Sequence, residues 1–394
     1  MIKNILTVNA GSSSIKLVLF EVNETPKRIL EAAVEKIGWP NASLTVKNWT
    51  QADSSTQPVD ATDHAAATSI LMEWIGRQVQ PEELLAIGHR IVHGGPKYSE
   101  SQLITQDVLE ELGKLTDFDP EHLPIELQLI EVFGQSFSGA AQVACFDTAF
   151  HHDLPNVARI IPIPRRYETQ GVRRYGFHGL SYTFLIRELA HQAGADTANG
   201  RVILAHLGNG ASLAAVHEGK SIDTSMGFTP TGGIPMSTRS GDLDPGLALY
   251  LAQSQGIDEF NNMVNFQSGL LGISETSSDM EKLLEIESSD TRAADAIALF
   301  CYQVKKYIGG SAAALGGLDT LVFAGGMGEN APKVRARICE GLDFLGISIE
   351  ESRNATNAGL ISADTSRVAV RVIRTDEAMT IANDVLQIVS IGAT

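Results

Sequence analysis

The sequence predicts an α/β protein built from two related domains. Its 394 residues exceed the length at which a single hydrophobic core usually stops growing. In addition, a strand, a turn of small residues and a returning strand occur twice, at 4–22 and at 201–216. Such a repeat indicates a duplicated α/β domain with a cleft between the two copies.

The elements of the first half follow from the spacing of apolar residues. Residues 4–9 have the composition of a buried strand, Ala10-Gly11 forms a turn, and residues 14–22 alternate like a second strand. The polar stretch 39–63 is typical of exposed loops and edge strands. We expect helices at about 64–79, 106–116 and 124–133, and a buried strand at 141–147.

The second half begins in the same way. Two strands, 201–207 and 211–216, flank the turn Gly208-Asn209-Gly210, and residues 321–330 predict a strand, a glycine-rich turn and a helix start. Further helices are expected at about 244–255, 291–314 and 378–389. We therefore place one domain at 1–148 with 378–394, and the other at 149–377.

The composition is that of a soluble globular protein with an acidic surface. Apolar residues make up 43% and charged residues 20% of the chain. No apolar run reaches the ~20 residues that span a bilayer. The formal charge of −17 repels nucleic acid and anionic lipid, so neither is an expected partner. The cysteines Cys145, Cys301 and Cys339 share no metal-ligand spacing, which favours a reducing cytoplasm.

Three glycine-containing turns have the features of phosphate-binding loops. After Gly11, hydroxyls and an ammonium share one strand face at Ser12, Ser14 and Lys16. The segment 206–212 joins two strands, and the segment 325–330 opens a helix whose N–H groups can hold a phosphate. Each turn also has a purely structural interpretation. The first can be a polar hairpin, the second a type I′ turn and the third an ordinary helix start.

Three cationic side chains are candidates for contact with an anion. Arg239 lies in the long loop 223–246, which is rich in glycine and serine and suits an arginine that meets developing negative charge. Arg90 follows a buried strand and can clamp a carboxylate, with a surface salt bridge as the alternative. His178 lies beside an aromatic residue and between glycines, which favours function over the structural role expected of most histidines.

Eight segments, taken in this order, resemble the acetate kinase family from residue 4 to about 385. They are Asn-Ala-Gly-Ser-Ser-Ser-Ile-Lys, His-Arg-Ile-Val-His-Gly-Gly, Phe-Asp-Thr-Ala-Phe-His, Tyr-Gly-Phe-His-Gly, His-Leu-Gly-Asn-Gly, Thr-Arg-Ser-Gly-Asp, Gly-Gly-Met-Gly-Glu-Asn and Thr-Asp-Glu. The resemblance implies the fold of sugar kinases and actin, in which duplicated ribonuclease-H-like domains bind a nucleotide between them. It also implies a homodimer.

Matched motif by motif, the resemblance implies roles for individual residues. Asn9 and Glu377 would hold Mg²⁺, or Mn²⁺ in its place, with ATP or ADP as co-substrate. The acid would lie against Arg90, Val92, Phe177 and Pro230, and the catalytic residues would be Asp147, His178 and Arg239. The nucleotide would contact Ser12, Ser14, Lys16, His206, Leu207, Gly208, Asn209, Gly210, Asp279, Met280, Glu281, Gly326, Met327, Gly328, Glu329 and Asn330.

Several positions depart from the family pattern. Glu121 stands where a pocket residue of the family is usually apolar, and an unpaired carboxylate there would repel a small acid. Tyr182 ends a segment that reads Phe-His-Gly-Thr-Ser-His in the family, Ser237 precedes the Thr-Arg pair, and Glu281 replaces an expected arginine. These changes leave the catalytic cations in place and bear on acid preference and nucleotide affinity.

The predicted reaction is the reversible transfer of the ATP γ-phosphoryl group to acetate, giving acetyl phosphate and ADP. A carboxylate is already ionised near neutral pH and needs no general base, whereas charge on the transferring group must be stabilised. Propionate or another short acid is the alternative within this chemistry. An actin-like nucleotide-binding regulator would have no use for Arg90, His178 and Arg239, and a sugar kinase would need Asp147 as a base.

Overall fold

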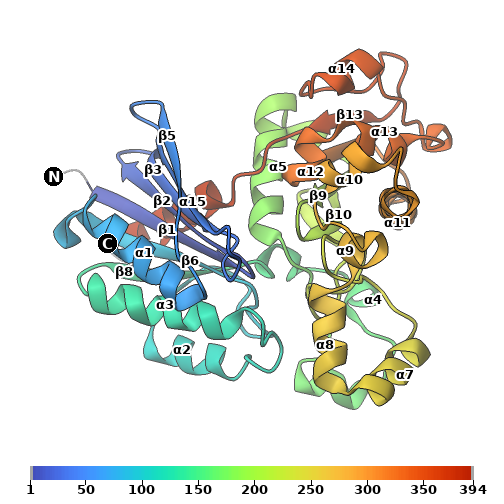
Figure 1. Ribbon diagram of the computed structural model, residues 1–394. Coiled ribbons are helices and arrows are strands. Elements are labelled where there is room, and N and C mark those ends of the chain that lie inside the picture. Colours follow the sequence, from blue (N-terminus) through green and yellow to red (C-terminus); the bar gives the residue numbers. More distant parts are fainter. Residues whose placement is uncertain (1–2, 392–394) are drawn as a thin grey trace. The chain divides into compact units, whose positions relative to one another are not determined.

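The computed structural model describes residues 3–391 and divides them into two compact units (Figure 1). The first unit comprises residues 3–149 and 376–391, and the second comprises residues 150–375. Unit 1 therefore contains segments from both ends of this range, with unit 2 inserted between them.

Unit 1 is built on an eight-stranded sheet with the order β5-β4-β3-β2-β1-β6-β8-β7. Strands β1, β6 and β8 are parallel, so their carboxyl ends lie at the same edge of the sheet. The strands are β1 (Lys3–Gly11), β2 (Ser14–Val22), β3 (Pro26–Glu35), β4 (Ser43–Asn48), β5 (Asp53–Pro58), β6 (Leu84–Ile91), β7 (Gln102–Leu103) and β8 (Ala141–Phe146).

The helices of unit 1 are α1 (His64–Gly76), α2 (Gln106–Gly113), α3 (Leu123–Ser136) and α15 (Glu377–Ile391), with a short 3-10 helix, η1 (Pro81–Glu83). Helix α15 packs closely on the sheet at Gly88 of β6. A Cβ atom on Gly88 would lie 2.4 Å from Ile381 Cγ2 and 2.6 Å from Val385 Cγ2. The absent side chain thus lets the last helix contact the strand that carries Arg90.

Unit 2 is built on a five-stranded sheet with the order β11-β10-β9-β12-β13. Its strands are β9 (Val202–Leu207), β10 (Ala211–His217), β11 (Lys220–Thr224), β12 (Thr320–Ala324) and β13 (Ala369–Val372). The antiparallel group β11-β10-β9 continues into the parallel strands β12 and β13. The segment β3-β2-β1-β6-β8 of the first sheet has the same order and directions. The predicted duplicated α/β fold is therefore confirmed.

Helix α5 packs on this second sheet through the buried residues Tyr182, Leu185 and Leu189. The helices of unit 2 are α4 (Asn156–Arg159), α5 (Gly179–Ala193), α6 (Ala195–Asn199), α7 (Pro245–Gln255), α8 (Ile257–Phe266), α9 (Gly269–Ser274), α10 (Met280–Ile286), α11 (Thr291–Leu315), α12 (Gly325–Asn330), α13 (Pro332–Cys339) and α14 (Glu351–Ala355). The 3-10 helices are η2 (Ala149–His151), η3 (Arg165–Gln170) and η4 (Asp343–Leu345).

The helices and strands expected from apolar spacing are present. Other elements, among them β3 and α5, have weaker signals in the sequence and were not predicted. Strand β3 begins at Pro26 and its buried residues do not alternate, and helix α5 begins without a side-chain cap. Glu377, expected just before the last helix, is its first residue. The three cysteines are buried and reduced. Within residues 3–391, every helix is too short or too polar to cross a bilayer.

Candidate active site

In unit 1, the predicted residues Asn9, Arg90 and Asp147 meet at the carboxyl ends of β1, β6 and β8. Arg90 donates from Nη2 to Asp147 Oδ2 at 2.6 Å and from Nε to the same oxygen at 3.1 Å. It also donates from Nη1 to the backbone oxygen of Ala10 at 2.9 Å. The guanidinium is therefore held by two neighbouring strands in one orientation.

This arginine keeps its charge although its side chain is largely buried. Burial acts against the charged form, but Asp147 and, more weakly, Glu377 attract it and raise the pKa of Arg90 above its ordinary value. The side chain of Asp147 is completely buried and that of Arg90 is 13% exposed. A preformed, permanently charged guanidinium of this kind is suited to bind a carboxylate.

Asn9 and Glu377, the predicted magnesium residues, are in direct contact. Asn9 Nδ2 donates to Glu377 Oε2 at 2.8 Å, which brings an amide and a carboxylate together at the start of α15. Magnesium usually binds through one or two such oxygens, several waters and the phosphates of its substrate. The pair fits that pattern. In residues 3–391, no group of three or more His, Cys, Asp or Glu side chains is arranged to hold a metal.

The hairpin between β1 and β2 carries the hydroxyl residues expected to contact phosphate. Gly11 pairs with Ser14, and the turn is Ser12-Ser13. Lys16 is half exposed, and its Nζ lies 2.9 Å from Glu31 Oε1. His64 Nε2 forms a hydrogen bond with the backbone oxygen of Gly11 at 3.0 Å. This contact supports the turn, so the role of His64 is structural.

Residues that the sequence analysis missed support the end of β6. Both carboxyl oxygens of Glu126 on α3 accept the N–H of Val92, at 3.1 and 3.2 Å. Burial raises the pKa of Glu126 well above its ordinary value of 4.5, against the attraction of Arg90. In the preceding turn, His122 Nδ1 and Asp119 Oδ1 are 2.8 Å apart, and Glu121 is half-buried.

In unit 2, His178 and Arg239 face the same small space beside Gly210. A Cβ atom on Gly210 would lie 3.1 Å from His178 Nε2 and 3.8 Å from Arg239 Nη1. Likewise, a Cβ atom on Gly208 would lie 3.3 Å from His206 Nε2. Because both positions lack a side chain, the two imidazoles and the Arg239 guanidinium can approach the backbone of the β9–β10 turn closely. Residues predicted to contact phosphate therefore lie together around this turn.

His178 has a backbone conformation that is uncommon for residues other than glycine. It precedes α5 with φ 60° and ψ 23°, in the left-handed region. Such strain is found where the surrounding structure fixes a functional group. The neighbouring Phe177 is buried, and its backbone oxygen contacts His151 Nε2 at 3.1 Å. Burial lowers the pKa of His151 to about 4, so it supports this segment as a neutral imidazole.

The loop that carries Arg239 is anchored to the loop that carries Gly210. Ser237 N donates to the backbone oxygen of Asn209 at 3.1 Å, and Met236 N donates to that of Arg239 at 3.0 Å. Arg239 Nη1 also contacts the backbone oxygen of Pro230 at 3.4 Å. These contacts connect three residues of the predicted site, Asn209, Pro230 and Arg239, within one unit.

Local contacts place two of the segments predicted to contact the nucleotide, 279–281 and 326–330. Gly325 approaches the β9–β10 turn so closely that a Cβ atom added at this position would lie 2.8 Å from the carbonyl carbon of Leu207. Glu329 Oε1 accepts the N–H groups of Gly325 and Thr375, at 2.9 and 3.1 Å. Asp279 caps α10 by accepting the Glu281 N–H at 3.0 Å. Buried Met280 and exposed Glu281 follow this cap.

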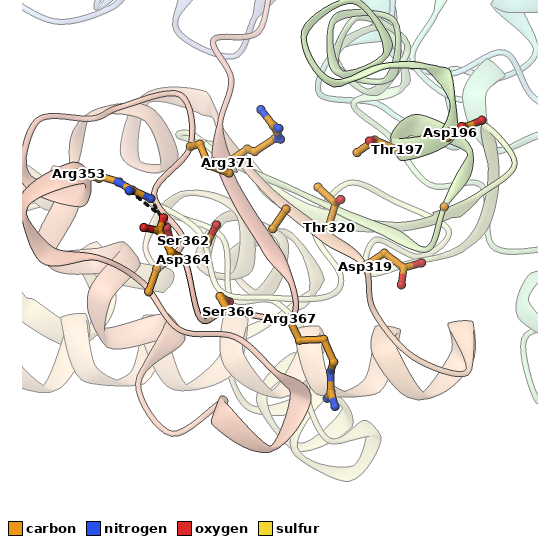
Figure 2. A pocket seen from close by; sticks show the side chains of 14 residues that line it. Asp196, Thr197, Asp319, Thr320, Arg353, Ser362, Asp364, Ser366, Arg367 and Arg371 are labelled. Atoms are coloured by element: carbon orange, nitrogen blue, oxygen red, sulfur yellow. Dashed lines mark hydrogen bonds and ion pairs between the residues drawn. The ribbon is translucent and has the colours of Figure 1, made fainter.

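A pocket of about 460 Å³ in unit 2 is not part of this site (Figure 2). Its lining includes Thr320 and Ala369, the first residues of β12 and β13, whereas the glycine-rich loop follows the last residue of β12. Figure 2 shows Arg353 directed toward Ser362 and Asp364, its partners at 2.9 and 2.8 Å. None of the predicted site residues lines this pocket.

The chain is similar to known acetate and propionate kinases. A family model described as the acetokinase family matches residues 4–383. The chain is 42% identical to a propionate kinase of Citrobacter rodentium (98% of this chain and 97% of that protein). It is 41% identical to an acetate kinase of Rhodopseudomonas palustris (98% and 99%).

Solved structures show the same relationship. A propionate kinase from Francisella tularensis is 35% identical, with a TM-score of 0.88 over 97% of this chain and 98% of that one. The acetate kinase of Porphyromonas gingivalis is also 35% identical, with a TM-score of 0.86 over 98% and 100%. On the match over residues 4–383 and these similarities, the chain belongs to the acetokinase family.

Proposed function

We propose that this protein is an acetate kinase, which transfers the γ-phosphoryl group of ATP to acetate and forms acetyl phosphate and ADP reversibly. Family membership supports the reaction class, and relatives named acetate kinase and propionate kinase are about equally similar to the chain. The observation that carries the proposal is the Arg90 guanidinium, which is fixed at the end of β6 in a form suited to a carboxylate.

The residues of each unit have complementary tasks in this reaction. In unit 1, Arg90 binds the acid, and Asp147 orients Arg90 through the contact at 2.6 Å. In unit 2, His178 and Arg239 hold the transferring phosphoryl group beside Gly210. Magnesium held by Asn9 and Glu377 would neutralise charge on the phosphate oxygens.

Propionate is the second candidate acid, because kinases named for it are among the relatives. The acid is proposed to lie against Val92, Phe177 and Pro230, and the turn before α3 contains the half-buried Glu121, at a position expected to belong to the acid pocket. A carboxylate near the pocket disfavours a closely packed methyl group. We therefore expect Glu121 to influence the choice among short acids.

The test is a hydroxamate assay of acyl phosphate, with ATP, magnesium and a series of C1 to C4 carboxylates. A maximum at acetate supports the proposal, whereas a maximum at C3 or C4 favours the second candidate. If no acid yields an acyl phosphate above a control without enzyme, the proposed function is wrong.

We also propose that the protein acts in the cytoplasm as a homodimer. Support for the dimer comes from α7, in which no residue is buried although its sequence is rich in leucine. A helix that is apolar on most of its surface is normally covered by another element. A second copy of the chain would provide that cover.

A further inference from the structure

Two imidazoles of the candidate site are stacked on each other and are bound from behind by buried serines. The rings of His178 and His206 have centroids 4.4 Å apart and planes inclined by 25°. His178 Nδ1 lies 2.8 Å from Ser212 Oγ, and His206 Nδ1 lies 2.8 Å from Ser181 Oγ. Both serines are inaccessible to solvent. In each ring, therefore, the Nδ1 edge is occupied by a hydroxyl.

The opposite edges of the rings face the glycines of the β9–β10 turn. The position of a Cβ atom on Gly210 is 3.1 Å from His178 Nε2, and that of a Cβ atom on Gly208 is 3.3 Å from His206 Nε2. Because Arg239 Nη1 also lies beside Gly210, the Nε2 edge of His178 is the one directed at the proposed phosphoryl position. The protonation of Nε2 therefore decides whether His178 donates or accepts there.

A second hydroxyl behind each serine restricts the direction of its hydrogen bond. Ser212 Oγ is hydrogen-bonded to the hydroxyl of Tyr182, which is completely buried, and Ser181 Oγ lies 2.6 Å from Thr375 Oγ1. A serine has a single hydroxyl proton, so it can donate to only one of its two neighbours. A phenol is a more acidic donor than an aliphatic hydroxyl, which favours donation from Tyr182 to Ser212.

If Tyr182 donates to Ser212, the proton of Ser212 is directed at His178 Nδ1. This nitrogen then acts as an acceptor, and a neutral imidazole with Nδ1 as acceptor carries its proton on Nε2. For His206, the hydrogen bond between Ser181 and Thr375 has no preferred direction, because both residues carry aliphatic hydroxyls. Only for His178, therefore, do the neighbouring hydroxyls favour one tautomer.

We propose that Tyr182 and Ser212 are positioning residues that hold His178 as the Nε2–H tautomer, so that its neutral ring donates a hydrogen bond to the anion beside Gly210. The inference rests on the proposed function, since it assigns the anion to the transferring phosphoryl group. His178 then requires no additional proton in order to stabilise that group, and the proton stays on Nε2 throughout.

The direct test is long-range ¹H–¹⁵N correlation spectroscopy of the protein with ¹⁵N-labelled histidines, recorded without substrate near pH 8. The resonances of His178 are assigned by their loss in His178→Gln. We expect a proton on Nε2 and a bare Nδ1 in the unsubstituted protein. A proton on Nδ1 would overturn the proposal without any measurement of activity.

The relay is the pair of hydrogen bonds from Tyr182 to Ser212 and from Ser212 to His178 Nδ1, and the Tyr182→Phe variant tests its contribution. It removes the donor behind Ser212 with almost no change in volume, and we expect a mixture of tautomers and a fall in kcat of about tenfold, as for other partners of functional histidines. Ser212→Ala removes the bond to Nδ1 itself and should show the same change of tautomer. Retention of the pure Nε2–H form in both variants contradicts the relay, whatever their kcat.

Tyr175→Phe is the matched control. Tyr175 is also buried, but its hydroxyl donates to the backbone oxygen of Gly171 at 2.7 Å and has no part in the relay. This variant should keep the tautomer and kcat of the parent. The spectroscopic result is independent of the acid assay, so a parent that forms no acyl phosphate refutes the proposed function while the tautomer is still decided.

Discussion

At the scale of single residues, Arg239 has the clearest expected effect on turnover. It shares the space beside Gly210 with His178, where charge would develop on the phosphoryl group. We expect Arg239→Ala to lower kcat by ~10²-fold or more, the magnitude for loss of one preorganised donor. The control is Arg292→Ala, which removes an exposed arginine paired with Glu275 at 2.6 Å. Equal kcat values for the two variants would remove Arg239 from the mechanism.

The buried Glu126 has an effect on stability that depends on pH. Its pKa is raised by burial, so the folded protein keeps this proton at pH values where the unfolded chain, with an ordinary pKa of 4.5, has released it. The stabilisation of the folded protein by the proton on Glu126 is therefore complete below about pH 4.5. It is lost as the pH rises toward the pKa of Glu126 in the folded state.

Glu126→Gln, which cannot ionise, should become more stable relative to the parent as the pH rises from 5 to 7. Urea unfolding at both values measures this difference, and Glu131→Gln, an exposed substitution on the same helix, controls for general effects of charge. A difference between parent and Glu126→Gln that is the same at both pH values would contradict the raised pKa.

At the scale of elements, the β9–β10 turn depends on an absent side chain. Gly210→Ala would place a methyl group beside His178 Nε2, where we propose that a phosphate oxygen lies. The backbone at this position is not left-handed, so alanine fits its conformation, but the methyl group would lie 3.1 Å from His178 Nε2 and would displace that ring. We therefore expect KM for ATP to rise about tenfold or more.

Helical Gly310 in α11 provides the matched control, because a Cβ atom there would meet nothing within 4 Å. Gly310→Ala should leave KM unchanged and stabilise the protein by about 0.5–1 kcal/mol. An unchanged KM in the Gly210→Ala variant would show that the space beside Gly210 is not used by the nucleotide.

Much of this architecture was predictable because buried parallel strands are apolar runs that end in polar residues. Asn9 and Asp147 are at or just beyond such ends, and the structure brings them to Arg90 as the fold requires. Glu126 was not predictable, because its contact with Val92 depends on how α3 docks on β6. The left-handed conformation of His178 is likewise imposed by the surrounding structure and not by residue preference.

At the scale of the whole molecule, the proposed homodimer depends on α7 and α8, two helices that lie side by side in unit 2 (Figure 1) and carry exposed apolar side chains. Leu249 and Tyr250 are 59% and 67% exposed on α7, and Ile257 is 68% exposed at the start of α8. We expect a double variant, Leu249→Asp with Tyr250→Asp, to be monomeric in size-exclusion chromatography with light scattering, because each carboxylate would have to be desolvated in an interface.

Val157→Asp changes an apolar residue outside these helices that is even more exposed, at 87%, and this variant should remain dimeric. A parent protein that is monomeric at micromolar concentration would refute the dimer. A double variant that stays dimeric would place the interface elsewhere on the surface.

The close packing of α15 on Gly88 has a consequence for synthesis on the ribosome. Unit 1 is interrupted by residues 150–375, and both Glu377 and the helix that covers β6 follow this insertion. A nascent chain that has emerged only through β8 thus exposes an uncovered sheet face and lacks one of the two residues proposed to hold the metal. Unit 2, whose chain is continuous, can complete its fold first, and the carboxylate-binding half becomes competent only after the final helix has docked.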